Sequence, residues 1–444
     1  MSARRAEALD YPGLVRELFP RLSGGIRWGL DRTQRLLDAV GNPERAWRAI
    51  HIAGTNGKGT AAAVAEAVLR AAGLRTGLYT SPHLTSFRER VRIDGRLIEE
   101  VALLESARAL WPHIEREAPS FFEATTAIAF DAFARAHVDV AVVEVGLGGR
   151  LDATNVIAPD VTVVTNVAVD HVEFLGPDPV GIAREKAGIA KPGVPFLVGE
   201  EDPSMLSVLV DGARERGAIV HRLPPDEPEL LDWDSDGTRF RLATRWGMLE
   251  ARLPLAGPQQ ARNAALALRA LELSPLHERV TLDAARRGVE ATRWPGRFQI
   301  ERVDGRTWIF DVAHNPSSIQ RLAATVLESR VARPLAVLLG VMGDKDWTAM
   351  LASLSAIADR IVLTRPEHAP AGRAWDPAAA AAALPPGRAE VVPLLGDAVQ
   401  AVRAAGDATV LVTGSFHTVG EAMIRLGIDP GWAPDPVVDV ALQR

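Results

Sequence analysis

Runs of apolar, often β-branched residues alternate with alanine-rich stretches along most of this 444-residue chain. In the first half, strand-like runs occupy residues 49–53, 138–145, 161–165 and 194–198, and helical stretches occupy residues 59–72, 123–136 and 182–190. Such alternation is typical of βαβ units, in which helices cover both faces of a parallel sheet. The sequence therefore predicts an α/β protein with a mostly parallel sheet.

The pattern changes twice farther along the chain. Residues 226–255 alternate between polar and apolar over short distances, which predicts antiparallel strands at a sheet edge, and a helix is expected at 260–271. Trp294-Pro295-Gly296-Arg297 interrupts the pattern, and a second α/β series follows, with strands expected at 308–312, 335–341, 360–363 and 409–413 and a helix at 378–383. We therefore expect a first domain at residues 1–293, a linker at 294–297 and a smaller second domain at 298–444.

The composition excludes several classes of protein. The absence of cysteine rules out a disulfide scaffold, and 50 basic against 56 acidic residues argue against a general nucleic-acid binder. No apolar stretch has membrane-spanning length, and the first residues, MSARRAEALD, lack an apolar signal segment. We therefore expect a cytoplasmic protein with neither a nucleic-acid partner nor a membrane partner.

Lysine is scarce, because only Lys58, Lys186, Lys191 and Lys345 are lysines among the 50 basic residues. An exposed position that needs only positive charge accepts arginine, so these four are candidates for positions that require a compact ammonium group. Chance retention is the alternative explanation for so small a sample.

A glycine-rich segment, Gly54-Thr55-Asn56-Gly57-Lys58-Gly59-Thr60, lies between an expected strand and an expected helix. In that context small residues let backbone N–H groups approach an anion, the helix N-terminus adds its dipole, and Lys58 reaches the outer phosphates. The spacing departs from the usual phosphate loop, with two residues instead of four before Gly57-Lys58. A purely structural turn is the alternative, and the lysine in the phosphate position favours nucleotide binding.

This loop variant, preceded by His51-Ile52-Ala53, resembles the ATP loop of the Mur ligase superfamily and, within it, of the folylpolyglutamate synthase/dihydrofolate synthase family. The resemblance implies a P-loop-type ATP-binding domain followed by a smaller Rossmann-like α/β domain. The matching segments keep the order and approximate spacing of the family; they are Ser81-Pro82-His83-Leu84, Phe122-Glu123-Ala124-Thr125-Thr126, the run from Glu144 to Asn155, Asp170-His171, Glu185-Lys186-Ala187-Gly188-Ile189, Trp294-Pro295-Gly296-Arg297, Asp311-Val312-Ala313-His314-Asn315-Pro316 and Gly343-Asp344-Lys345-Asp346.

Glu144 ends an apolar strand at the sheet edge where ligands bind. The residues alone leave two roles open for Glu144, a Mg²⁺ ligand or an ion-pair partner of an arginine such as Arg150, and a histidine like His171, taken alone, is more often a loop histidine than a ligand. The resemblance implies that Ser81, Glu144 and His171 hold two Mg²⁺ ions beside the ATP phosphates.

Lys186 is the fourth metal-site residue that the resemblance implies. An ammonium group about 4 Å from a metal cation is repelled by several kcal/mol per unit charge at an effective dielectric of ~20, so it must face phosphate or be modified. In similar ligases the lysine of this segment is carbamylated, which turns a cation into an anionic metal ligand. We hypothesise the same for Lys186, beside the catalytic roles expected for Lys58 and His314.

The resemblance also implies binding residues for three substrates. Asn263, Arg297 and Asp311 belong to the ATP site, although Gln259 stands where the family usually has histidine. His314 and Ser415 are glutamate-site candidates, with a loop histidine and a helix-capping serine as the alternatives, and Lys345 is a candidate ion-pair partner of Asp311. The pterin or folate candidates are Gly29, Leu30, Phe122, Glu123, Leu151, Asp152 and Ala153.

Together these residues suit an ATP-dependent ligase. Lys58, Arg297 and the metals would neutralise the γ-phosphate, so that a dihydropteroate or folate carboxylate attacks it and L-glutamate captures the acyl phosphate, with release of ADP and phosphate. A peptidoglycan-building Mur ligase is one alternative, but only about fifty residues precede the loop where it needs a uridine-nucleotide domain. A non-enzymatic P-loop protein is the other, and it would not explain the second domain. A monomer is the family expectation.

Overall fold

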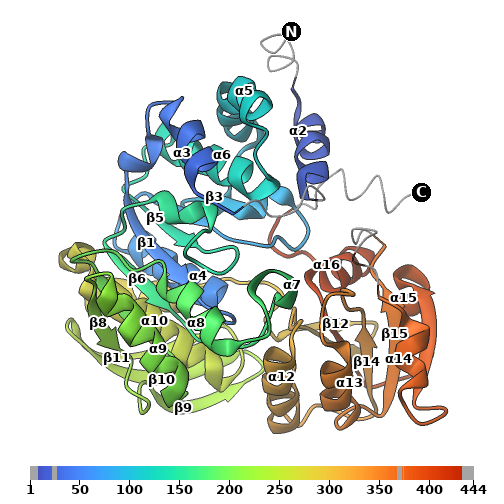
Figure 1. Ribbon diagram of the computed structural model, residues 1–444. Coiled ribbons are helices and arrows are strands. Elements are labelled where there is room, and N and C mark those ends of the chain that lie inside the picture. Colours follow the sequence, from blue (N-terminus) through green and yellow to red (C-terminus); the bar gives the residue numbers. More distant parts are fainter. Residues whose placement is uncertain (1–8, 23–27, 368–372, 374, 433–444) are drawn as a thin grey trace.

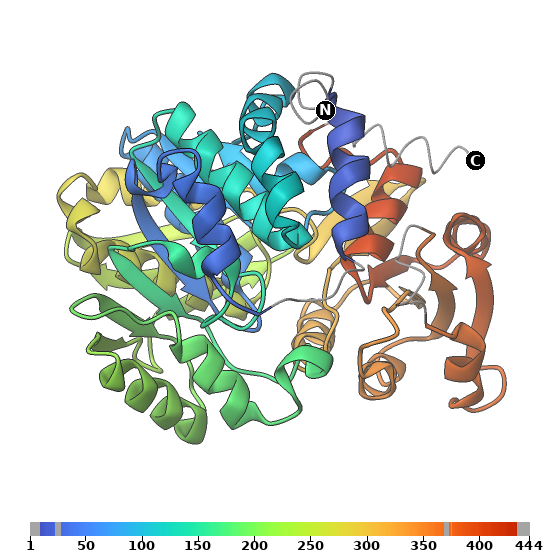
Figure 2. The same ribbon diagram turned by 45° about the horizontal axis from the view of Figure 1, so that its top comes forward.

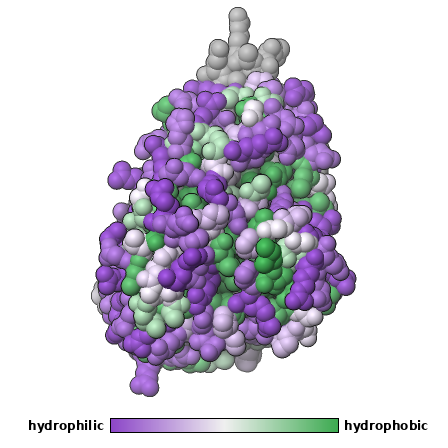
Figure 3. All heavy atoms as spheres, turned by 90° about the vertical axis from the view of Figure 1, so that its left-hand side faces the viewer, coloured by the Kyte–Doolittle hydropathy of each residue, from purple (hydrophilic) through white to green (hydrophobic). Residues whose placement is uncertain are grey.

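The computed structural model describes residues 9–22, 28–367, 373 and 375–432. These residues form two α/β lobes that lie side by side (Figures 1 and 2). No helix in this part of the chain combines the length and the apolar composition that a membrane crossing requires. Figure 3 shows one face of the first lobe, where hydrophilic residues cover most of the surface and apolar residues form small groups between them.

The first lobe is built on an eight-stranded sheet of order β4-β3-β2-β5-β1-β6-β7-β8. All neighbours from β2 to β8 in this order pair in parallel, and β3 alone runs in the opposite direction, antiparallel to both β2 and β4. The mostly parallel sheet predicted from the sequence is therefore confirmed. Its strands are β1 (Arg48–Ala53), β2 (Thr76–Tyr79), β3 (Val91–Ile93), β4 (Arg96–Leu97), β5 (Val140–Glu144), β6 (Val161–Val164), β7 (Pro195–Val198) and β8 (Ile219–Arg222).

Helices cover both faces of this sheet. The α-helices are α2 (Tyr11–Leu18), α3 (Asp31–Asp38), α4 (Lys58–Ala71), α5 (Glu100–Glu117), α6 (Phe121–Arg135), α7 (Val172–Leu175), α8 (Pro179–Ala187), α9 (Pro203–Glu215), α10 (Pro258–Leu273) and α11 (Leu282–Ala291). Short 3₁₀ helices are η1 (Phe19–Leu22), η2 (Pro43–Arg45), η3 (Phe87–Arg90), η4 (Ala153–Val156) and η5 (Pro275–Glu278).

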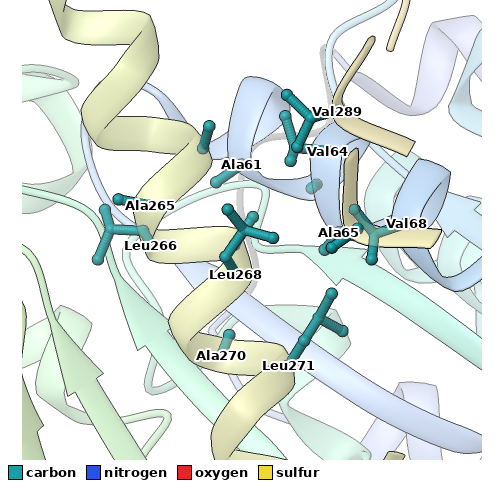
Figure 4. Packing of buried hydrophobic residues seen from close by; sticks show 14 of the residues in the cluster. Ala61, Val64, Ala65, Val68, Ala265, Leu266, Leu268, Ala270, Leu271 and Val289 are labelled. Atoms are coloured by element: carbon teal, nitrogen blue, oxygen red, sulfur yellow. The ribbon is translucent and has the colours of Figure 1, made fainter. Parts of the chain in front are cut away.

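The helix α4 lies at the centre of one face of the sheet. Its residues from Gly59 to Leu69 are all buried, which explains why so many of them are alanine. Leu268 and Leu271 of α10 point toward α4, and Val289 of α11 lies beside Val64 (Figure 4). Close packing on every side fixes the helix and therefore the loop at its N-terminus.

The antiparallel strands expected at residues 226–255 form, but not at the edge of the main sheet. They make a separate three-stranded sheet of β9 (Glu229–Asp234), β10 (Gly237–Thr244) and β11 (Gly247–Leu253). One face packs Phe240, Leu242 and Leu249 into the core shared with α4 and α10. Because that face is buried against helices, the strands cover α10 and α11 instead of extending the sheet, whose edge is β8.

The second lobe has a six-stranded sheet of order β12-β13-β17-β14-β15-β16, in which only β12 runs antiparallel. The sheet begins two residues after Arg297, and the domain limits that we expect remain a prediction. Its elements are β12 (Gln299–Val303), β13 (Arg306–Phe310), α12 (Pro316–Glu328), β14 (Leu335–Leu339), α13 (Trp347–Ser355), β15 (Arg360–Arg365), α14 (Pro377–Ala382), β16 (Ala389–Leu394), α15 (Leu395–Ala404), β17 (Thr409–Thr413) and α16 (Phe416–Arg425).

A first prediction concerns Gly288, where α11 lies directly against the backbone of α4. A Cβ atom at Gly288 would lie 2.4 Å from the Cα atom of Val68, so Gly288→Ala forces the two helices apart. We expect the free energy of unfolding to fall by about 2 kcal/mol or more in urea titrations. Gly181→Ala on α8 is the matched control, because its Cβ would be 3.4 Å from the Oδ2 atom of Asp178. Equal stability of both variants would contradict the close helix contact.

Candidate active site

The glycine-rich loop connects β1 to α4 and has the backbone shape that its glycines predict. Gly54 has a φ of +147°, and a Cβ atom there would lie 1.8 Å from the Oγ1 atom of Thr165. Gly57 has a φ of +85°, and its Cβ would lie 2.4 Å from the Oδ1 atom of Asn263 on α10. Both positions therefore exclude a side chain, and the second places Asn263 against the loop.

Lys58 begins α4 and folds back over the loop. Its ammonium group donates to the carbonyl oxygens of Gly54 and Thr55, each at 3.1 Å. The ammonium lies 4.0 Å from the Oε1 atom of Glu144, so the cation and the carboxylate are neighbours in the cleft. The loop itself is held by Asn166, whose Oδ1 atom accepts from the N–H of Asn56 at 3.0 Å. This arrangement presents a fixed positive charge at a helix N-terminus, where anions bind.

Four side chains from different strand ends and helices line the same cleft as the loop. They are Ser81 after β2, Glu144 at the end of β5, His171 after β6 and Lys186 on α8. Glu144 is 4% exposed and accepts from the N–H of Ser81 at 3.3 Å. Burial raises the pKa of Glu144, and the charge of Lys58 opposes that rise. Of the two roles left open for Glu144, pairing with Arg150 is wrong, because Arg150 pairs with Glu185 at 2.8 Å.

Lys186 and His171 both lie in surroundings that favour their neutral forms. Lys186 is 3% exposed, and burial together with the charge of Lys58 lowers its pKa to about 7. In the described part of the chain no carboxylate lies within ion-pair distance of Lys186. Burial, together with the charge of Lys345, lowers the pKa of His171 to about 3. A neutral imidazole is the form of histidine that binds metals.

The donor set fits an open magnesium site. No three His, Asp or Glu side chains come together as a metal cluster among the described residues. One carboxylate, one imidazole and one hydroxyl would leave positions for phosphate oxygens and water. Mg²⁺ is usually held in this way, by one or two carboxylates together with substrate phosphates.

The second lobe closes the cleft from the opposite side with Arg297, Asp311, His314 and Phe416. The guanidinium group of Arg297 lies 5.2 Å from the ring centre of Phe416. Asp311 accepts from the N–H groups of Phe298 and Ala313, and burial raises its pKa against the charge of Arg297. His314 donates its Nδ1 hydrogen to the carbonyl of Val312 at 2.8 Å, which leaves Nε2 facing the cleft side.

Asp170 connects the two lobes, a role that the sequence did not predict. Its carboxylate forms an ion pair with Lys345, accepts from the Nδ2 group of Asn315 at 3.0 Å and lies 3.5 Å from the Nε2 atom of His314. The expected pairing of Lys345 with Asp311 is therefore wrong. Burial alone would raise the pKa of Asp170, but the hydrogen bond and charge of His314 and the charge of Lys345 hold it well below its ordinary value.

The same network reaches the phosphate loop. Asn315 also donates its Nδ2 hydrogen to the Oδ1 atom of Asn56 at 3.1 Å, so one side chain of the second lobe bonds both to Asp170 and to the loop. The carboxylate of Asp170 and the ammonium of Lys345 are only 7% and 5% exposed. The position of Asp170 in the loop after β6, beside His171, was the available signal for this role.

The remaining predicted residues lie outside the cleft lining. Ser415 caps α16, and its hydroxyl oxygen accepts from the N–H of Thr418. This is the helix-capping role that was the alternative to glutamate binding. Glu123 forms a capping box with Ser120 and pairs with Arg32 at 2.9 Å. Phe122, Asp152 and Ser81 surround Gly146, where a Cβ atom would meet each of them within 3.6 Å. Gly29 and Leu30 precede α3, and Leu151 and Ala153 flank Asp152 at η4.

Other residues line the cleft that the sequence did not assign to it. They include Gln260 on α10, Ser318 and Arg321 on α12, and Phe416 on α16. Gln259 also lines the cleft, next to Gln260. The periodicity of a helix does not distinguish these positions from ordinary surface positions. They line a cleft only because the two lobes meet there.

Comparisons with known proteins agree with this geometry. The pattern of the Mur ligase middle domain matches residues 52–271, and that of the Mur ligase glutamate ligase domain matches residues 296–416. The dihydrofolate synthase/folylpolyglutamate synthase of Mycobacterium tuberculosis is 37% identical over 445 residues, covering 90% of each chain.

Two solved structures are similar over nearly the whole chain. The Mycobacterium tuberculosis folylpolyglutamate synthase complexed with ADP and AMPPCP has a TM-score of 0.84 and 35% identity, covering 95% of this chain and 99% of that one. A bifunctional folylpolyglutamate synthase/dihydrofolate synthase with Mn, AMPPNP and L-glutamate bound has a TM-score of 0.79 and 34% identity, covering 91% of this chain and 95% of that one.

The ion pair between the lobes gives a second prediction. Lys345→Met leaves the carboxylate of Asp170 buried without its cation, and Asp170→Asn leaves the ammonium unpaired, so each should lower the free energy of unfolding by about 3–5 kcal/mol. The double variant should lose clearly less than the sum, as measured in a double-mutant cycle by urea unfolding. The exposed pair of Arg239 and Asp232 is the control, with a coupling energy of at most about 1 kcal/mol. Additive losses at Lys345 and Asp170 would exclude the coupling.

Proposed function

Since this chain belongs to the folylpolyglutamate synthase/dihydrofolate synthase family of Mur ligases, which are ATP-dependent ligases of folate-type carboxylates and glutamate, we propose that its cleft performs this reaction through an acyl phosphate. The observation that carries the proposal is the convergence, in one cleft between two lobes, of the phosphate loop, Glu144, Lys186, Arg297 and His314. A cleft between lobes suits a reaction that must bring three substrates together.

The first step transfers the γ-phosphoryl group. The carboxylate oxygen of the pteroate or folate substrate forms a bond to the γ-phosphorus atom, the bond from that atom to the bridging oxygen breaks, and ADP leaves. Two like-charged groups meet in this step, so positive charge must neutralise the phosphate. Lys58 supplies that charge from the first lobe and Arg297 from the segment that joins the lobes. Asn263 and Asp311 complete the proposed ATP site.

We infer that the site binds divalent cations, namely two Mg²⁺ ions beside the phosphates. Ser81, Glu144, His171 and Lys186 in its carbamylated form would hold them. The cations supply additional positive charge for the phosphate oxygens. The burial of Glu144 and the lowered pKa of His171 suit this role, because Glu144 is held where water competes little for a ligand and a neutral imidazole binds metals.

The second step forms the amide. The amine of L-glutamate attacks the acyl carbon, its proton is released, and the carbon–oxygen bond to phosphate breaks. We infer that residues 298–444 bind the glutamate, with His314 and Ser415 on its side, and that residues 1–293 bind ATP and the pterin. Gly29, Leu30, Phe122, Glu123, Leu151, Asp152 and Ala153 are the proposed pterin or folate contacts. Residues 294–297 link the two parts.

Closure of the lobes protects the intermediate from water, because an acyl phosphate hydrolyses when solvent reaches it. The network of Asp170, Lys345 and Asn315 joins the lobes next to the phosphate loop and so stabilises the closed form. A cytoplasmic location and a monomeric state remain predictions, as does the choice between dihydropteroate and folates as substrate.

The experiment that tests the function measures ADP release with a pteroate-type substrate and L-glutamate, added separately and together. Release should require both, and ¹⁸O in the substrate carboxylate should pass into inorganic phosphate, because the carboxylate oxygen leaves with phosphorus. ATP hydrolysis indifferent to both substrates would instead support a non-enzymatic or switch-like P-loop protein. Absence of the isotope from phosphate would exclude the acyl phosphate.

Lys58→Ala gives a third prediction. The variant removes the charge that faces the γ-phosphate, so kcat for amide formation should fall by at least about 10³ while circular dichroism shows the native fold. Lys191→Ala is the matched control, because Lys191 lies outside the cleft lining and donates to the carbonyl of Asn155 at 2.8 Å. Substantial turnover by Lys58→Ala would contradict its role.

Carbamylation of Lys186 gives a fourth prediction. The neutral amine adds CO₂ and releases one proton, so the modification should increase as pH rises through about 7, where burial places the pKa of Lys186. Native mass spectrometry in bicarbonate should show the added mass of one CO₂, lost on acidification and absent from Lys186→Gln. A bare amine under alkaline bicarbonate would reject the modification.

A further inference from the structure

A second cavity, of about 570 Å³, lies behind the segment that joins the lobes. Its walls come from α4, β3, the joining segment around Trp294 and the segment Asp429–Trp432. Four arginines line it, against two acidic residues, so its lining is positively charged; the arginines are Arg70, Arg92, Arg293 and Arg297, and the acidic residues are Glu66 and Asp429. Of the residues placed in the proposed substrate sites, only Arg297 also lines this cavity.

Arg92 on β3 is the side chain that sets the chemistry of the cavity. It is 5% exposed, and its guanidinium carbon lies 4.8 Å from the ring centre of Trp294 and 4.6 Å from that of Trp432. The Nε atom is fully buried without a hydrogen-bond partner. Within the described residues, no carboxylate lies within 4.0 Å of Arg92. An outside ligand cannot reach this enclosed Nε atom, so the terminal Nη groups are the donors that remain for an acceptor in the cavity.

The nearest acidic side chains are already engaged. The Oε1 atom of Glu66 accepts from the Nε of Arg70 at 3.0 Å and from the hydroxyl of Thr76 at 2.6 Å. The Oε1 atom of Glu89 accepts from the backbone of Thr85 and from the indole of Trp432. Neither carboxylate turns toward Arg92 as an ion-pair partner.

The geometry also selects the shape of the acceptor. Indole rings lie close to the guanidinium of Arg92, so its hydrogen bonds must leave through its edge, in the plane of the group. Two parallel N–H groups along that edge match the two oxygens of a carboxylate. Arg293 at the cavity wall adds positive charge without a carboxylate partner of its own among the described contacts.

We propose that this cavity binds a carboxylate group of a small anionic molecule, with Arg92 as its bidentate partner. Two sources share this chemistry, a γ-glutamyl chain and a free amino acid such as L-glutamate, and only the first rests on the proposed function. The site also touches the phosphate loop. Trp294 packs over Gly59 at the start of α4, where a Cβ atom would lie 2.8 Å from its ring, so a ligand on Arg92 fixes a wall next to Lys58.

The test is isothermal titration calorimetry on the full chain, saturated with AMPPNP and Mg²⁺ so that the phosphate loop is occupied. The probes are tri-γ-L-glutamate, L-glutamate and inorganic phosphate. Tri-γ-L-glutamate should bind, and Arg92→Met should weaken that binding at least about tenfold, because a charged bidentate contact is lost. Inorganic phosphate is the control for a general anion site, because its oxygens also pair with a guanidinium group.

Two further variants complete the test. Arg92→Lys keeps the charge but loses the flat guanidinium and its paired edge, and should weaken binding even where Arg92→Met fails to fold. Arg286→Met, at an exposed arginine paired with Asp283, should bind as the parent chain does. Equal affinity for L-glutamate identifies the free amino acid as the source. Binding of no probe, binding unchanged in both Arg92 variants, or phosphate as the tightest probe would overturn the proposal. Ligase turnover is measured in a separate assay, so a failure of the proposed function is distinguished from a failure of this binding site.

Discussion

The fixed position of α4 is the constraint on which the cleft depends. The helix is packed on all sides by the sheet, α10 and α11, and its many alanines let these neighbours approach closely. Its N-terminus therefore points the loop N–H groups and Lys58 at one place. Every strand end that contributes to the cleft, from Ser81 to His171, is arranged around that place. A shift of α4 would separate the phosphate loop from the side chains that it must face.

The cleft also depends on the contact between the lobes. Asp170 comes from the first lobe, whereas Lys345 and Asn315 come from two different loops of the second. Because Asn315 also bonds to Asn56, closing the lobes orders the phosphate loop at the same time. A buried ion pair adds little net stability by itself, but it penalises any arrangement in which its members are apart. The network therefore favours one relative position of the lobes over others, which is what a multi-substrate ligase needs.

Much of this arrangement is predictable from the sequence, and the exceptions have physical causes. The loop, Glu144 and Lys186 are local, because a strand end and the residues after it point to one sheet edge wherever the rest of the chain lies. The partner of Lys345 is not local, since it depends on how two lobes meet, and the prediction of Asp311 failed there. Strand β16, which has no buried residue, was not predicted. The strands β9–β11 were predicted, but their position was wrong, because short alternating strands do not reveal which surface they cover.

The unequal use of lysine and arginine follows from the same geometry. Lys58 turns back onto the carbonyls of its own loop, and Lys345 is enclosed beside Asp170, so both positions hold a compact ammonium group where a planar guanidinium would not fit in the same way. Lys186 needs a primary amine if it is to take up CO₂, which no arginine provides. Arg92 requires the opposite: a flat cation that stacks on the indoles of Trp294 and Trp432 and keeps an edge free. Where surface charge alone is needed, arginine occupies almost every position, and the cation chosen at each buried site therefore reports the shape of the anion or ligand that it faces.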